Sequence, residues 1–356
     1  MKTGSKTLRS NIITYGLVVV FYIVMQGLYM TDNLSSLMEG LMVPLCYYMI
    51  LAVSLNLVVG ISGELSLGHA GFMCVGAFSS AVFARLVDEK IPGMAELIIA
   101  ILIGAAFAAI FGFLIGIPVL RLKGDYLAIV TLAFGEIIKN LINAVYLGVD
   151  ANGLHVSLKD TKSLNLLEDG DIIIKGAQGI GKLPRNATFT IGIILLLITL
   201  FIVINLVNSR QGRSIMSIRD NRIAAESIGL SVSKYKLTAF VISAALAGVA
   251  GVLYSHNLAN LQATSKNFGY NQSIMILVFV VLGGIGNIRG SMIAAVILTI
   301  LPEKLRFLND YRMLIYAIVL IAMMILNSAP KVVAWRKVMA EKYFPHKGKI
   351  NEPGEA

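Results

Sequence analysis

The chain has 356 residues, of which 57% are hydrophobic and only 14% are charged. Soluble globular domains carry about 25% charged residues, so this composition excludes them and indicates an integral membrane protein. The formal net charge of +10 comes from short basic clusters between apolar runs. Membrane topology explains this pattern, and we therefore expect a lipid membrane and no nucleic acid as a partner.

The apolar runs predict an all-α polytopic membrane fold. A membrane-spanning helix needs about 20 mainly apolar residues, whereas a β-barrel would show alternating segments of about ten residues. The first run, residues 11–30, is too long for a cleaved signal sequence and is expected to be retained. We expect about ten spans in total. The later ones are predicted at residues 41–60, 65–87, 96–120, 126–147, 188–208, 237–257 and 313–326, with a broken helix pair within residues 273–301.

Basic residues predict that both termini lie in the cytoplasm. The N-terminal cluster, Arg121 with Lys123, residues 209–236 and the tail at residues 329–356 all fall on one side, as the positive-inside rule requires. Three further basic residues do not fit this side: Lys304, Arg306 and Arg312. An odd number of spans in each half would invert the halves relative to each other, although no residue-level repeat is visible.

The polar segment at residues 148–187, here called the external loop, is expected outside the cytoplasm. Its strand-like piece at residues 171–174 predicts a small hairpin. The run from Gly176 to Lys182 fits the start of a phosphate-binding loop, but Leu183 stands where Ser or Thr would hold magnesium. The two cysteines lie in separate apolar runs. We therefore expect no nucleotide site, metal site, cofactor or catalytic activity in this chain.

Residues 209–236, here called the connector, join two apolar spans. Ser217 and Asp220 have the S-x-x-D spacing of a helix start, Arg222 and Glu226 form an i, i+4 pair, and Gly229 is a C-terminal stop. These signals predict a helix of about three turns with its charges mainly on one side. The other side is a shallow face of Ala224, Ala225 and Ile228. The simplest alternative is a surface helix that only joins two spans.

Glycines, a carboxylate and an imidazole meet at the seam of two apolar runs, in residues 60–72, the first break. Irregular backbone at membrane depth is tolerated only where it is buried in protein or lines a watery cavity, and ionisable residues there are functional candidates. The candidates for a transport path in this stretch are Gly63, Glu64, Ser66, Gly68 and His69. The alternative is that Glu64 and His69 lie on an exposed cytoplasmic turn.

A second glycine-rich interruption, residues 283–290, divides the apolar run near the C-terminus and is called the second break. Its path candidates are Gly284, Gly286 and Asn287. Thr131 and Glu136 are further candidates from the expected fifth span, where Lys139 lies one turn after Glu136. A charge at mid-membrane costs about 2.5–3.5 kcal/mol unless it faces protein or water. Glu136 is therefore either a structural partner of Lys139 or a substrate contact.

Five stretches, in order from about residue 40 to 305, resemble the permeases of branched-chain amino acid ABC importers. They are the first break, residues 121–136, the Asn152-Gly153 turn, the Ala224-Ala225-x-x-x-Gly229 pattern and residues 276–290. The pattern in the connector looks like the loop by which such permeases dock on their ATPases. It departs from many relatives because Ile223 fills a place that often holds Glu. The motifs indicate the family and not the substrate, since urea and short-amide permeases are similar.

The resemblance implies a non-enzymatic transport subunit in the inner membrane of a bacterial cell. It would act with ABC ATPase subunits, a second permease subunit and an extracytoplasmic substrate-binding protein. The residues implied in coupling to the ATPases are Arg219, Asp220, Arg222, Ala224, Ala225, Glu226 and Gly229. An ATP-independent transporter, with Glu64, His69 and Glu136 as an ion relay, and a channel gated at the glycine breaks stay open as alternatives. The resemblance, more than the apolar character of the spans, favours a branched-chain amino acid over urea as the substrate.

Overall fold

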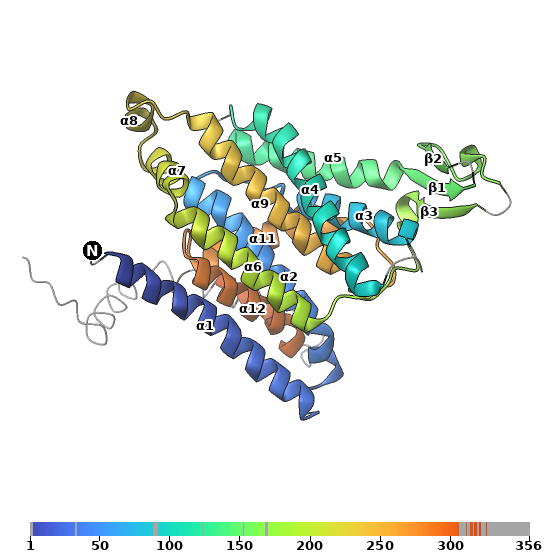
Figure 1. Cartoon of the computed structure of the whole chain (residues 1–356), viewed down its shortest axis with the longest axis horizontal. Coiled ribbons are helices and arrows are strands. Elements are labelled where there is room, and N and C mark those ends of the chain that lie inside the picture. Colours follow the sequence, from blue (N-terminus) through green and yellow to red (C-terminus); the bar gives the residue numbers. More distant parts are fainter. Residues whose placement is uncertain are drawn as a thin grey trace, which may run out of the picture. The chain divides into compact units, whose positions relative to one another are not determined.

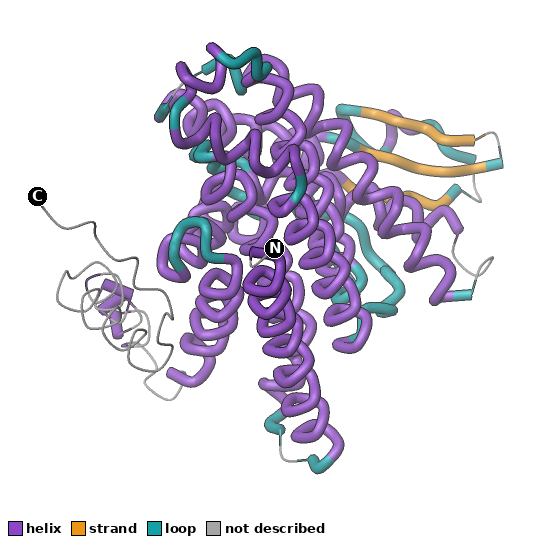
Figure 2. The backbone as a smooth tube through the Cα atoms, turned by 60° about the vertical axis from the view of Figure 1, so that its left-hand side comes forward, coloured by secondary structure: helices purple, strands orange, loops and turns teal. Residues whose placement is uncertain are grey.

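The computed structural model describes residues 3–32, 34–87, 92–122, 124–151, 153–167 and 170–305, with isolated positions between 311 and 325. Met1–Ile300 form one compact unit, which is dominated by helices (Figures 1 and 2). Several sequence predictions fall outside the described residues: the roles of Lys123, Asn152, Arg306 and Arg312, the last span at residues 313–326 as a continuous helix, and the tail at residues 329–356.

Seven of the described helices are long and apolar enough to cross a membrane, which confirms the all-α polytopic fold. The second of them, α2, continues directly into a π-helical turn, η1 (Leu57–Ser62). The spans lie within α1 (Thr3–Met30), α2 (Ser36–Asn56) with η1, α3 (His69–Val87), α4 (Gly93–Val119), α5 (Asp125–Ala144), α6 (Phe189–Asn208) and α9 (Val232–Ser255).

The shorter helices lie in the connector and around the second break. The connector contains α7 (Arg210–Asp220) and α8 (Arg222–Ser227), and its last residues already belong to α9. After α9 follow α10 (Ser265–Phe268), α11 (Tyr270–Gly283) and α12 (Ile288–Lys304). The last two are the broken helix pair that the glycines predict. Among the described residues the count is thus seven candidate spans and this pair, so the expected total of about ten is approximate.

Helices α3, α4 and α9 pack closely against one another, because small residues let their backbones approach. A Cβ atom added to Gly76 of α3 would lie 2.4 Å from the Cα atom of Gly248 of α9. One added to Gly104 of α4 would lie 2.4 Å from the side chain of Val252. Such close helix contacts drive association in membranes, where burying apolar surface contributes little.

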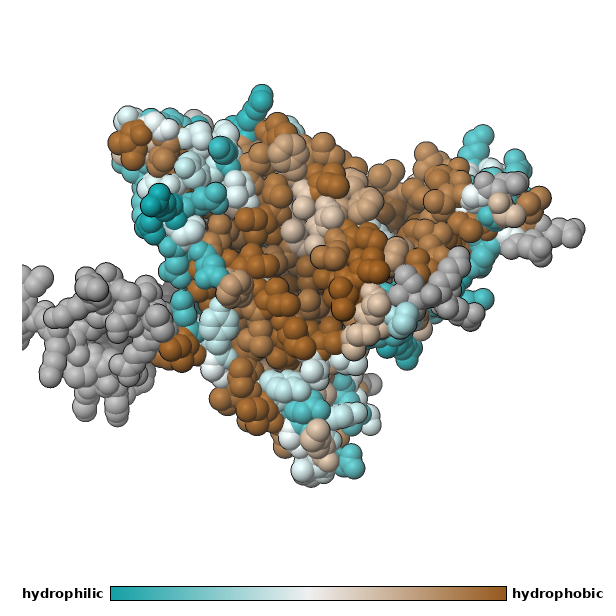
Figure 3. Space-filling model, viewed as in Figure 1, coloured by the Kyte–Doolittle hydropathy of each residue, from teal (hydrophilic) through white to brown (hydrophobic). Residues whose placement is uncertain are grey.

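The exposed helix faces are apolar, as a lipid environment requires. In the apolar window of α2, 89% of the residues are buried, against 22% in α4 and 17% in α1. Figure 3 shows apolar side chains over the middle of the helices and hydrophilic ones at the end that carries α7 and α8, at the opposite end and around the sheet. The outer helices therefore face lipid or a partner, and the core is formed around α2 and α9.

The external loop forms a three-stranded antiparallel sheet in the order β2-β1-β3 (Figure 1). It comprises β1 (Tyr146–Asp150), β2 (Gly153–Ser157) and β3 (Asp171–Lys175). The strand predicted at residues 171–174 is confirmed, but the hairpin joins β1 to β2, and β3 pairs with β1 across Tyr146 and Lys175. The expected fifth span at residues 126–147 is therefore too long, because its last residues supply the central strand.

We predict that Gly76→Leu destabilises the unit by about 1–3 kcal/mol, because the new side chain must displace the α9 backbone. The measurement is the thermal unfolding midpoint of the purified full-length chain in detergent. Gly16→Leu in α1 is the matched control, since a Cβ atom there meets nothing within 4 Å. Equal midpoints for the two variants would contradict the close α3–α9 contact.

Candidate functional site

The first break is a true interruption between α2 and α3. The π-helical turn ends at Gly63, whose φ of +75° is a left-handed conformation that favours glycine. Residues 63–68 then run without helical structure until α3 begins at His69. Gly68 is needed for a different reason, since a Cβ atom there would lie 2.3 Å from the carbonyl oxygen of Thr131 in α5. The backbone N–H of Leu67 donates to the Thr131 hydroxyl at 3.0 Å.

Glu64 and His69 are buried, with 9% and 2% of their surfaces exposed. The alternative that they lie on an exposed cytoplasmic turn is therefore wrong. Lys236 of α9 forms an ion pair with Glu64, and the Nε2 atom of His69 lies 2.7 Å from the Ser54 hydroxyl. Both ionisable residues thus hold the first break against neighbouring helices.

Two hydroxyl groups in the first break are buried without a hydrogen-bond partner among the described residues. They belong to Ser62, which is 3% exposed, and Ser66, which is 1% exposed. A buried polar group that lacks a partner costs about 1–3 kcal/mol. The first break therefore retains unused hydrogen-bonding capacity inside the protein.

The second break turns the chain between α11 and α12. Gly284 and Gly286 have φ values of +95° and +82°, which explains why glycine occupies both positions. Asn287 closes the turn, because its side-chain oxygen accepts from the N–H of Gly290 at 3.2 Å. A Cβ atom added to Gly290 would lie only 1.8 Å from the carbonyl oxygen of Gly283, so the two helices touch through their backbones.

The two breaks lie against each other although they are far apart in the sequence. A Cβ atom added to Gly60 would lie 2.3 Å from the nitrogen of Gly286. Asn56, which is fully buried, accepts from the N–H of Gly286 at 2.8 Å and donates to the Ser291 hydroxyl at 2.7 Å. Asn56 and Ser291 are not among the residues predicted from the sequence, in which Asn56 stands out only as a single amide in an apolar run.

Glu136 lies in a separate cluster at the start of α11. It pairs with Lys139, which confirms an ion pair at this spacing, and its Oε1 atom accepts from the N–H of Tyr270 at 2.8 Å. Lys139 also donates to the Ser265 hydroxyl at 3.0 Å. The path candidates therefore fall into two groups, one around the two breaks with Thr131 and one around Glu136.

The connector contains two helices, which corrects the single helix expected from Ser217 and Asp220. Ser217 lies in the last turn of α7, and Asn221 is the N-cap of α8, where its side chain accepts from the N–H of Ala224 at 3.1 Å. Asparagine caps helices as well as serine or aspartate does, so the local sequence offered several starts. The ion pair of Arg222 with Glu226 is confirmed at 2.9 Å.

The exposed face of the connector also differs from the predicted face of Ala224, Ala225 and Ile228. Ala225 is 3% exposed and packs against Ile218 and Val232 inside the chain, so it is not part of a free surface. Ile223 and Ile228 are 78% and 75% exposed, and Ala224 is exposed between them. Gly229 ends the helix with a φ of +84°, as expected of a C-terminal glycine.

The connector contacts the first break directly through Arg219. Its Nη1 atom donates to the carbonyl oxygen of Gly60 at 2.8 Å, while the same guanidinium pairs with Asp220 at 2.8 Å. The absence of a side chain at Gly63 leaves room for the aliphatic part of Arg219, because an added Cβ atom would lie 2.6 Å from its Cγ atom. Any displacement of α7 therefore acts on the turn that follows Asn56.

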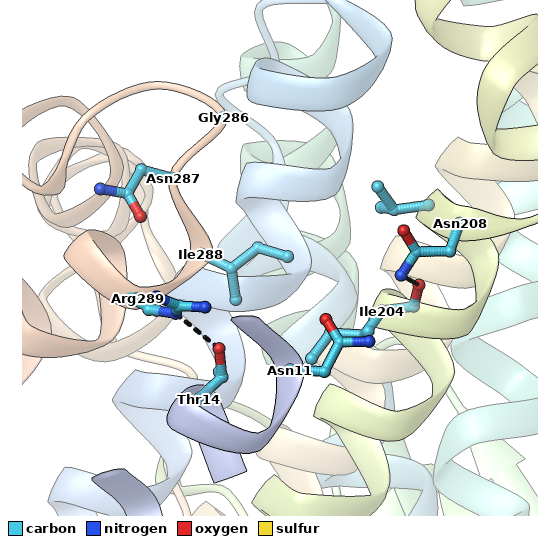
Figure 4. Close-up of a pocket in the computed structure, with 9 residues that line it drawn as sticks. Asn11, Thr14, Ile204, Asn208, Gly286, Asn287, Ile288 and Arg289 are labelled. Atoms are coloured by element: carbon cyan, nitrogen blue, oxygen red, sulfur yellow. Dashed lines mark hydrogen bonds between the residues drawn. The ribbon is translucent and has the colours of Figure 1, made fainter. Parts of the chain in front are cut away.

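A polar cavity of about 310 Å³ lies beside the second break (Figure 4). In Figure 4 the Arg289 side chain points toward Thr14 of α1, to which its Nε atom donates at 2.6 Å. Asn208 and Ile204 of α6 lie on the other side of the cavity from Asn287 (Figure 4). The second break thus borders polar space at the end of the helices that carries the connector.

Discontinuous helices, a buried ion pair that joins α9 to the first break, and a helical connector define a multi-pass membrane protein with an architecture typical of transporters. Residues 37–324 match the family described as branched-chain amino acid transport system, permease component. The chain belongs to this family.

Among similar proteins is the high-affinity branched-chain amino acid transport system permease protein LivM of Escherichia coli K12. It is 37% identical over 287 residues, which cover 78% of this chain and 66% of LivM. LivM of Salmonella typhimurium LT2 matches with the same identity and coverage. The chain thus spans just under two thirds of these relatives. The fructose import permease protein FruG of Bifidobacterium longum is 27% identical over 84% of this chain and 85% of its own length. No solved structure matches the chain.

We predict that Asn221→Ala weakens α8 by about 0.5–2 kcal/mol, because the helix loses its N-cap hydrogen bond. Hydrogen exchange of the α8 amides in the purified chain should become faster. Ser217→Ala is the matched control and should leave the exchange unchanged. Faster exchange in the Ser217 variant alone would restore the single-helix interpretation.

Proposed function

We propose that the chain is the permease subunit of an ATP-driven importer for branched-chain amino acids. It would lie in the bacterial inner membrane with both termini in the cytoplasm and form the translocation path. Its proposed partners are ABC ATPase subunits, a second permease subunit and an extracytoplasmic substrate-binding protein. The observation that carries this proposal is the contact of Arg219 in the connector with Gly60 in the first break, since it joins an exposed docking surface to a helix break.

The coupling surface of the proposal is the exposed side of α8. Ile223, Ala224 and Ile228 offer an apolar contact to an ATPase, with the Arg222–Glu226 pair beside them. Movement of the ATPases would displace α7 and α8 together, because Ala225 packs against Ile218 of α7. Arg219 and the Lys236–Glu64 pair would pass this displacement to the two ends of residues 60–64.

The translocation path is proposed to run past the first break. The hydroxyls of Ser62 and Ser66, which have no partner among the residues that the structure describes, would gain hydrogen bonds from a polar solute, which removes the cost of their burial. Broken helices also offer free carbonyl and N–H groups to the two charged groups of an amino acid. Gly63, Gly68 and Thr131 shape this part of the path.

The second permease subunit is proposed to cover the outer faces of α5 and α11. Asn140 and Asn271 are exposed there, Tyr270 is 47% exposed and the Glu136 side chain is 26% exposed. Polar groups at membrane depth are costly in lipid and are found facing protein or water. A related subunit on this face would place Glu136 beside the path and away from lipid.

The binding protein is proposed to dock on the outer strand of the sheet. Leu154, Val156 and Leu158 follow one another at alternate positions and are 59%, 65% and 65% exposed. β2 lies at the edge of the sheet, so its outer backbone groups are also available to a partner. Apolar side chains in such a row offer a contact to a protein surface.

We expect the complex, reconstituted with its own binding protein and ATPases, to accumulate leucine, isoleucine or valine only when ATP is supplied. The LivM relatives support this substrate, while the likeness to FruG makes fructose the comparison sugar. Uptake of urea, short amides or fructose without any uptake of the three amino acids would contradict the proposed substrate. Uptake without ATP would overturn the importer class.

A pair of charge variants separates the two proposed docking surfaces. Ile228→Asp should abolish co-purification with the ATPases, because it places a charge in the proposed apolar contact, and uptake should fall at least about tenfold. Leu158→Asp, also at an exposed position, should retain the ATPases but remove the stimulation of ATP hydrolysis by loaded binding protein. If both variants behave alike, neither surface has the assigned partner.

A further inference from the structure

We propose that Asn56 is a positioning residue that holds the two breaks together as one gate at the connector end of the helices. The gate is defined as residues 60–63 with Gly284, Gly286 and Asn287. This inference rests on the proposed transport function and adds how the path would be closed and opened. Arg219 would transmit the movement of the connector to the same turn.

The backbone around Asn56 is built for this contact. Asn56 is the last α-helical residue of α2, and the π-helical turn that follows is wider than an α-helical one. Such turns are rare and occur frequently at functional sites. Gly60 lies on the same side, and a Cβ atom there would lie 2.0 Å from the side-chain oxygen of Asn56. Glycine at this position therefore lets the amide reach the second break.

The Asn56 amide spans the turn of the second break with both of its functional groups. Its oxygen accepts from the N–H of Gly286, before Asn287, and its nitrogen donates to the hydroxyl of Ser291, in the first turn of α12. A side chain needs an acceptor and a donor at one end to make both contacts, and an amide provides them. Asn56 and Ser291 are each 0% exposed, so water cannot replace these bonds in the closed state.

The connector also contacts the π-helical turn that follows Asn56. Gly60 lies four residues after Asn56, and its carbonyl oxygen accepts a hydrogen bond from Arg219. Moving α7 therefore displaces the turn that follows Asn56. The two breaks can separate only when both hydrogen bonds of the Asn56 side chain break. Ser62, whose buried hydroxyl has no partner within the described part of the chain, lies in this turn and would become accessible to water when the gate opens.

The first test measures opening without transport. Ser62→Cys is introduced into the full-length chain with Cys46→Ala and Cys74→Ala, and labelling by a water-soluble maleimide is followed in nanodiscs. Asn56→Leu keeps the size of the side chain but removes both hydrogen bonds, so labelling should accelerate about tenfold. Ser80→Ala is the matched control, since it removes a buried 3.1 Å contact between α3 and α9 away from the gate. Equal labelling rates in the protein that retains Asn56, in the Asn56→Leu variant and in the Ser80→Ala variant would contradict the proposed gate.

The second test measures coupling in the complex with its ATPases and binding protein. Asn56→Leu should raise ATP hydrolysis in the absence of loaded binding protein and lower uptake per ATP about tenfold. Ser291→Ala, which leaves the bond to Gly286 in place, should have a smaller effect, and the double variant should be no worse than Asn56→Leu alone. Arg219→Gln should make Ser62→Cys labelling insensitive to ATP.

Hydrolysis and uptake that fall in parallel in Asn56→Leu would indicate a folding defect and overturn the positioning role. If the wild-type complex shows no ATP-dependent uptake, the proposed function fails. The labelling rates then still decide whether Asn56 holds the two breaks closed, because that experiment needs neither substrate nor ATPase.

Discussion

The structure depends on satisfying backbone N–H groups where its helices are interrupted. In a bilayer each such group needs a partner from the protein, since water is absent. Four of these groups are bonded by side chains from distant helices. Leu67 donates to Thr131, Ala70 to Ser273, Tyr270 to Glu136 and Gly286 to Asn56. These bonds explain why polar residues recur inside otherwise apolar spans.

The same bonds connect the two halves of the chain. In each half a long helix, α2 with η1 or α9, is followed by a stretch without regular helix and then by α3 or by α10 and α11. The two long helices also touch, because the Ser243 hydroxyl donates to the carbonyl oxygen of Ser54 at 2.6 Å. The start of α3 is held by α5 and α11, and the start of α11 is held by α5. An element that moves one interruption thus acts on the other.

Glycine has two different roles in this arrangement. At Gly63, Gly284 and Gly286 it permits left-handed backbone, whereas at Gly60 and Gly68 it permits the approach of another segment. Substitution at the first group strains the turn, and substitution at the second separates elements that must touch. Both kinds occur within the breaks, which are therefore defined by backbone contacts more than by side-chain chemistry.

Most of the local structure could be predicted from the sequence. Apolar runs of about 20 residues become helices in a bilayer because a helix makes all of its backbone hydrogen bonds within one segment. Glycines and charges within such runs marked both breaks, and the Arg222–Glu226 pair and the stop at Gly229 depend only on residues a few positions apart. The choice of Asn221 over Ser217 as the N-cap did not follow, since either residue can cap a helix.

Only the tertiary structure decided which distant groups meet. Asn56 bonds to Gly286 across 230 positions, and Lys236 pairs with Glu64 across 172. Ala225 faces inward although its neighbour Ala224 is exposed, because α8 packs against Ile218 and Val232. Periodicity records which residues are apolar along one helix, but the partner of a buried polar group depends on how all the helices pack. The local sequence therefore determined where the chain is interrupted, and the packing determined what holds each interruption.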